Sequence, residues 1–145
     1  MTDQSPTRTA EAAPIRLEVE ADGVAVLTLT RSAQRNALSL GMMTAIETAL
    51  EQIAADPAAR VVVLRAEGPA FCAGHDLKEM RASPDRASYE ALFAQCSRMM
   101  TRIVRLPKPV IAEVSGIATA AGCQLVASCD LAVAATTARF ATPGV

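Results

Sequence analysis

The chain has 145 residues, of which 51% are apolar and 20% charged, and its formal net charge is −1. Disordered chains combine low hydrophobicity with high net charge, so this composition predicts a folded protein, and the length suits a single domain. Aromatic residues make up only 3% and there is no basic excess. Both facts disfavour binding to nucleic acid or to an anionic membrane, which needs cationic and stacking groups.

The first predicted elements are a β-hairpin and a helix. Residues 15–20 and 24–30 alternate apolar and polar side chains on either side of an Ala-Asp-Gly turn, the pattern of two paired strands. Ser39 offers an N-cap hydroxyl, and apolar residues recur with helical spacing from Leu40 onward. Pro57 disfavours the helical conformation in the residue before it, so the helix is expected to end there.

Buried strands alternate with helices along the rest of the chain. Residues 61–64 form an unbroken apolar run, typical of a strand covered on both faces. Ser83 and Pro84 predict the start of a second helix, with Pro84 in its first position and an apolar stripe extending to Ile103. The remaining elements are a strand at 110–114, a helix at 124–128 and a short buried strand at 130–135. This alternation predicts an α/β domain.

Cysteine spacing and the first residues set expectations for the compartment. The four cysteines form no C-x-x-C pair and the only histidine is His75, so we expect reduced, buried thiols and no metal site. Residues 1–14 lack the apolar stretch of a secretory signal, and we expect a disordered leader there, before a folded domain at 15–145. No apolar run is long enough to span a membrane, and we expect a cytoplasmic protein. The cysteines are Cys72, Cys96, Cys123 and Cys129.

Two turns rich in small residues follow predicted strands. Gly74 lies in the first and is followed by Asp76, which can cap a helical turn, while Ala120 and Ala121 open a helix in the second. Small side chains let a ligand oxygen approach free backbone N–H groups, and two such turns could converge on one oxygen as an oxyanion hole. Tight helix packing is the alternative explanation. Lys78 and Glu79 are expected on a solvated helix face.

Three motifs resemble the crotonase (enoyl-CoA hydratase/isomerase) superfamily over about residues 15–145. They are Arg35-Asn-Ala-Leu, Phe71-Cys-Ala-Gly-His-Asp-Leu and the segment 116–130. The amino-acid sequences of these motifs are most similar to those of the subgroup called enoyl-CoA hydratase domain-containing protein three. The resemblance implies a ββα superhelix of the ClpP/crotonase fold that binds acyl-CoA thioesters. Compared with that family, the chain looks truncated after the central strands, so a fragment is expected.

The resemblance also implies roles for individual residues. It places the oxyanion-hole donors at the backbone N–H groups of His75 and Ala121, and residues near Arg35 and Ala37 against the adenine and phosphates of coenzyme A. A solvated surface charge is the alternative for Arg35. The implied substrate and coenzyme A contacts are Arg35, Ala37, Ala73, Gly74, His75, Asp76, Leu77, Ala120, Ala121, Gln124, Pro143 and Gly144.

The departures from the family pattern weaken the expected chemistry. Hydratases of the family use two glutamates as acid and base, and their positions fall on Gln124 and Gly144 here. Losing a positioned acid–base group costs ~10²–10⁴-fold in rate, so we expect weak or absent hydratase activity. The imidazole of His75 is either an acid or base beside the thioester or a ring that only packs, with the N–H alone contributing.

Several interpretations of the function stay open. The first is a lyase or isomerase of fatty acid metabolism with an altered acid–base set. The alternatives are a non-catalytic acyl-CoA-binding relative or an inactive fragment, while a dinucleotide-binding domain is disfavoured because no G-x-G-x-x-G motif follows the first strands. The resemblance implies no cofactor beyond the coenzyme A of the substrate, and a homotrimer or dimer of trimers.

Overall fold

The computed structural model describes residues 12–143, which fold into two sheets and the helices that pack on them. The larger sheet has five strands in the order β1-β2-β3-β5-β7. Its first two strands, Ile15–Val19 (β1) and Val24–Leu29 (β2), form the predicted antiparallel hairpin. The other three run parallel to β2 and are Val61–Ala66 (β3), Val110–Val114 (β5) and Leu131–Ala134 (β7).

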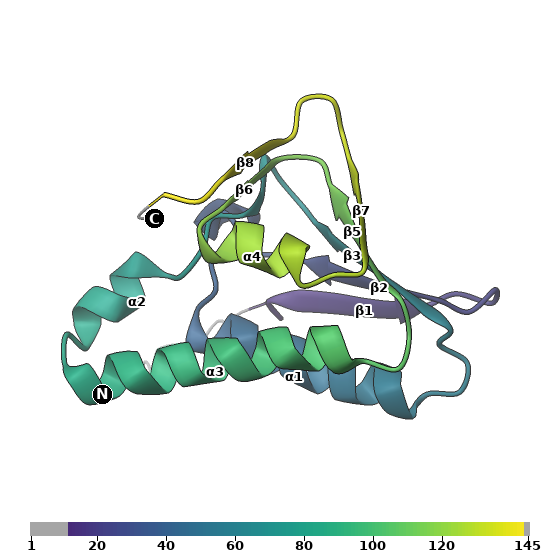
Figure 1. Ribbon diagram of the computed structural model, residues 1–145, viewed down its shortest axis with the longest axis horizontal. Helices are drawn as coiled ribbons and strands as arrows, with labels where there is room; N and C mark the ends of the chain where they lie inside the picture. The colour runs from purple at the N-terminus through teal and green to yellow at the C-terminus, as the bar shows by residue number, and fades with distance from the viewer. Residues whose placement is uncertain (1–11, 144–145) are drawn as a thin grey trace, which may run out of the picture.

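A second sheet, which the sequence did not predict, carries the turns rich in small residues. Its strands are Ala70–Cys72 (β4), Ile117–Thr119 (β6) and Arg139–Ala141 (β8), all parallel and in the order β4-β6-β8. Each strand has only three residues, too short to display the alternation by which a strand is recognised in sequence. Figure 1 shows β6 and β8 at one end of the molecule, with the seven-residue helix Ala121–Ala127 (α4) beneath them.

The two long helices, Leu40–Ala55 (α1) and Arg86–Arg105 (α3), pack against each other along the opposite side of the molecule (Figure 1). Ser39 caps α1 as predicted, since its side chain accepts a hydrogen bond from the Met42 N–H. Apolar residues from both helices join those of the sheet in one continuous core, in which Met43, Ile46, Met99 and Ile103 are at most 2% exposed.

The predicted start of α3 was wrong by two residues. The helix begins at Arg86 rather than Pro84, because the side chain of Asp85 accepts a hydrogen bond from the Ser88 N–H at 2.9 Å and caps it. A short helix, Leu77–Ala82 (α2), precedes it. Asp76 caps α2 as expected, accepting bonds from two N–H groups at 3.0 Å. Glu79 was expected on a solvated face, but its carboxylate accepts a hydrogen bond from the Leu40 N–H at 2.9 Å.

Two predictions of burial were wrong. The strand β7 was predicted to be buried, yet Leu131 is 63% and Val133 64% exposed. β7 is the last strand of its sheet, pairs only with β5 and contributes no residue to the buried core of the described chain, so neither of its faces is covered. All four cysteines are free, but Cys123 and Cys129 are only half-buried. Most of the predicted leader, residues 1–11, lies outside the described residues.

Candidate active site

The first turn of the site is positioned by a backbone ladder between residues 35–38 and 73–76. The Ala73 N–H donates to the carbonyl of Arg35 at 3.1 Å, the Leu38 N–H donates to the carbonyl of Gly74 at 2.8 Å, and the Asp76 N–H donates to the carbonyl of Leu38 at 3.4 Å. In a trans peptide the C=O and the following N–H point in opposite directions. The Gly74 carbonyl faces Leu38, so the His75 N–H points away from Leu38. This N–H meets no acceptor among residues 12–143.

Asn36 holds this ladder in place from inside the protein. It is fully buried at 0% exposure, and its backbone has a φ of 52°, a left-handed conformation that asparagine tolerates better than most residues. Its Nδ2 donates to the carbonyls of Glu67 and Ala70, both at 2.9 Å. These bonds join the 35–38 segment to the residues around β4, the strand that leads into Gly74.

The second turn presents another unused donor at the start of α4. The Ala120 N–H donates to the carbonyl of Ala141 at 2.9 Å, and the Ala120 carbonyl accepts bonds from the N–H groups of Cys123 and Gln124. The carbonyl therefore points into the helix, and the Ala121 N–H points out of its first turn without an acceptor in the described part of the chain. Ala120 has a φ of 53°, a strained conformation for a residue with a Cβ.

The two turns are in close contact because glycines line their interface. A Cβ added at Gly74 would lie 3.1 Å from the Ala120 Cβ and 3.5 Å from the Ala121 nitrogen. A Cβ at Gly122 would lie 2.0 Å from the carbonyl oxygen of Cys72, so α4 packs directly on the backbone of β4. The sequence therefore places the residues that carry the two unused N–H groups next to each other.

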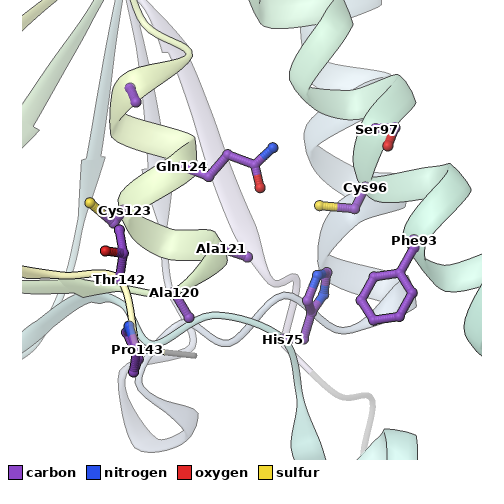
Figure 2. A pocket seen from close by; sticks show the side chains of 11 residues that line it. His75, Phe93, Cys96, Ser97, Ala120, Ala121, Cys123, Gln124, Thr142 and Pro143 are labelled. Carbon is purple, nitrogen blue, oxygen red and sulfur yellow. The ribbon is translucent and has the colours of Figure 1, made fainter. Parts of the chain in front are cut away.

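These residues border two cavities of about 470 Å³ and about 510 Å³. The two cavities share the lining residues His75, Phe93, Ala120 and Pro143, so they lie against the same side chains, and together they are called the trough below. Figure 2 shows the Gln124 side chain reaching from α4 into the first cavity, opposite Cys96 on α3. None of the residues that line the trough in the described chain is an aspartate, glutamate, lysine or arginine.

The imidazole of His75 lines both cavities, and its burial favours the neutral form. Its ring meets the Phe93 ring edge to face, with centroids 5.3 Å apart. Its Nδ1 is buried and has no hydrogen-bond partner within residues 12–143. Burial lowers the pKa of His75, and the backbone of Leu38 opposes that shift. Burial also raises the pKa of the Cys96 thiol, which keeps that group protonated.

The structure brings together most of the residues that the sequence analysis selected. His75, Ala120, Ala121, Gln124 and Pro143 line the first cavity, and Ala73 and Leu77 line the second. Arg35 is exposed and, like Ala37, does not line either cavity. Asp76 caps α2, and Gly144 lies outside the described residues.

Sequence reasoning missed the wall contributed by α3, including Phe93, Cys96 and Ser97. Cys96 was assigned to the core stripe of the helix, and its burial is consistent with that. Phe93 lies off the stripe and is 47% exposed. A large aromatic side chain outside the apolar face of an amphipathic helix was the signal that could have indicated this wall.

The sequence profile of the enoyl-CoA hydratase/isomerase family matches residues 19–145. A curated relative, the mitochondrial enoyl-CoA hydratase domain-containing protein 3 of Xenopus laevis, is 47% identical over 91% of the chain and 45% of its own length. A crystal structure of an enoyl-CoA hydratase from Mycobacterium smegmatis matches with a TM-score of 0.88 and 57% identity, over 90% of the chain and 51% of that protein. A crystal structure of the human enoyl-CoA hydratase domain-containing protein 3 matches with a TM-score of 0.85 and 44% identity, over 90% of the chain and 51% of that protein.

Proposed function

The chain belongs to the enoyl-CoA hydratase/isomerase family, has the crotonase fold and is similar to the domain-containing protein 3 subgroup, as its motifs predicted. On that basis, we propose that it binds an acyl-CoA thioester and holds the thioester oxygen between the N–H groups of His75 and Ala121. The chain spans about half the length of the relatives it matches. The activity of a whole protein of this kind is therefore part of the proposal.

The observation that carries the proposal is the pair of unused, oriented donors on adjacent turns. Each N–H is aimed by a hydrogen bond to the carbonyl of the same peptide unit, so neither donor has to reorganise when negative charge forms on an oxygen between them. In known oxyanion holes a donor of this kind is worth ~3–4 kcal/mol to the transition state. Gly74 supports the arrangement, since a side chain there would crowd Ala120.

The trough has room for both parts of the ligand. One cavity would take the acyl group and the other the pantetheine arm, with the thioester at the shared residues His75 and Ala120. We extend the family expectation that Arg35 and Ala37 lie near the adenine and phosphates, and the exposure of Arg35 leaves its cationic side chain available to a phosphate. A homotrimer, the lack of a separate cofactor and a cytoplasmic location remain predictions.

Calorimetric titration tests the binding directly. Butyryl-CoA is expected to bind more tightly than free coenzyme A, because only the thioester offers a carbonyl oxygen to which the two N–H groups can donate. Equal affinities for the two compounds would contradict a thioester site. Binding without any turnover in an activity screen would favour the second candidate function, a non-catalytic acyl-CoA-binding protein. The observation that favours this candidate is Gln124, which stands where the family has a glutamate.

Crotonyl-CoA hydration is expected to be slow or absent. Gln124 reaches into the first cavity, but an amide does not exchange protons usefully near neutral pH, and Gly144 has no side chain. Loss of one positioned acid–base group lowers the rate ~10²–10⁴-fold, and two losses together leave a rate little above that of the uncatalysed reaction in solution. The absorbance of the conjugated thioester follows the reaction, and rapid loss of that absorbance with the pure protein would contradict the prediction.

A further inference from the structure

We propose that the imidazole of His75 is a general base that removes an α-proton from the bound acyl-CoA thioester. The inference rests on the proposed function and extends it, because it assigns the acid–base group that the replacement of the family's glutamates leaves vacant. The result is an enolisation activity, visible as exchange of α-hydrogens with solvent, that does not require Gln124 to carry a proton.

The position of the ring carries the inference. His75 lines both cavities, so its side chain lies where the thioester crosses from one to the other. In Figure 2 the ring projects upward from its turn into the space between α3 and α4. The same residue supplies the backbone N–H for the thioester oxygen. Since the α-carbon is bonded to the carbonyl carbon, a base on this residue lies beside the bond that has to break.

The two ring nitrogens lie in different surroundings. Nδ1 is buried without a hydrogen-bond partner in the described residues, and Nε2 is not a buried atom of this kind. We therefore assign the basic lone pair to Nε2, in the tautomer that carries the ring proton on Nδ1. The edge-to-face contact with Phe93, at a centroid distance of 5.3 Å and an interplanar angle of 80°, fixes the plane of the ring.

The surroundings leave the ring unprotonated and leave no competing base. From α3, Phe93 meets the ring and Cys96 lines the same cavity, and burial raises the pKa of the Cys96 thiol. The α4 segment contributes Gln124 and Cys123, whose sulfur points away from His75 in Figure 2. The α2 segment contributes only Leu77 and Met80. With no charged side chain lining the trough in the described chain, burial dominates and holds the pKa of His75 below its usual value of 6.5.

The step balances without a further reactant. The lone pair of Nε2 takes the α-hydrogen as a proton, the electrons of the C–H bond form the C=C bond of the enolate, and the carbonyl π electrons move to the oxygen. The N–H groups of His75 and Ala121 then stabilise that oxygen. In D₂O the imidazolium exchanges its proton for a deuteron with solvent and returns it to the α-carbon. The product is deuterated acyl-CoA and a neutral imidazole.

The test is α-hydrogen exchange of butyryl-CoA in D₂O, followed by proton NMR with the full chain. His75→Ala keeps the backbone N–H and removes only the ring, so it separates the two roles of this residue. We expect His75→Ala to bind butyryl-CoA within about twofold of the parent and to exchange at least ~10²-fold more slowly. His75→Gln should behave in the same way. Lys78→Ala, an exposed residue on the neighbouring turn, should exchange at the parent rate.

The pH dependence of the exchange rate distinguishes a base from a ring that only packs against its neighbours. The exchange rate of the parent should fall about tenfold per pH unit below the pKa of His75, and become level above about pH 7. An equal exchange rate in His75→Ala, or a parent that binds butyryl-CoA without exchange above buffer, would overturn the assignment and leave the thioester site standing. A parent that does not bind butyryl-CoA would overturn the proposed function as well. Circular dichroism shows whether each variant is folded.

Discussion

Gly122→Ala is expected to destabilise the protein by more than ~3 kcal/mol, a large part of the stability of a small domain. The added Cβ would lie 2.0 Å from the carbonyl oxygen and 2.7 Å from the carbonyl carbon of Cys72. These are backbone atoms in β4, so no side-chain rotation relieves the contact, and α4 has to move away from the strand. That movement would also separate the N–H of Ala121 from that of His75. Urea denaturation measures the loss.

Gly41→Ala is the matched control for this change. Gly41 lies in the first turn of α1, and the atom nearest to a Cβ there would be the Ser39 Oγ at 3.9 Å, an ordinary contact. Alanine favours the helix over glycine by up to ~1 kcal/mol, so this variant should be as stable as the parent or slightly more stable. Similar stabilities for the two variants would contradict the close packing of α4 on β4.

Asn36→Asp is expected to cost ~3–5 kcal/mol at neutral pH, because it places an unpaired carboxylate in the core. The amide that it replaces is fully buried and donates to the carbonyls of Glu67 and Ala70 at 2.9 Å. A carboxylate oxygen in that place would repel both carbonyl oxygens. Burial and repulsion favour the protonated acid, so the stability of the variant should fall as the pH rises above the ordinary range of aspartate.

Denaturation at about pH 5 and at about pH 7.5 measures this dependence. The loss relative to the parent should be smaller at the lower pH, where a protonated carboxyl can donate to one carbonyl. Gln34→Glu is the control, since it makes the same change of amide to acid at an exposed residue close by and should alter stability by at most ~0.5 kcal/mol. A variant at position 36 with parental stability at both pH values would contradict the role assigned to this side chain.

The hairpin and the long helices were predictable because each carries a periodic pattern over several residues, and β3 was predictable from its unbroken apolar run. Ser39, the hairpin and the apolar stripe of α3 each followed from local chemistry that the fold preserves. The small sheet was not predictable in this way, because its strands are too short to show a period. The exposure of β7 depends on its place at the end of the sheet order, which no local pattern encodes.

The candidate site was predictable as two turns but not as a pocket. Gly74 and Ala121 indicated where backbone donors could be free, since small residues let a ligand atom approach the backbone, and Gly74 also lets the two turns pack closely. The opposite wall, with Phe93 and Cys96, comes from a helix that sequence reasoning assigned to the core alone. The side chain of Asn36 was also missed, since a single buried amide between two loops leaves no pattern in a sequence.

The most direct test of the account is the infrared spectrum of butyryl-CoA labelled with ¹³C at its carbonyl and bound to the full chain. Two N–H donors on one oxygen polarise the C=O bond, so its stretching frequency should lie clearly below that of the same compound in buffer. His75→Ala, which keeps its N–H, should retain the shift. A bound carbonyl that absorbs at or above its frequency in buffer would contradict the assignment of the N–H groups of His75 and Ala121 to the thioester oxygen.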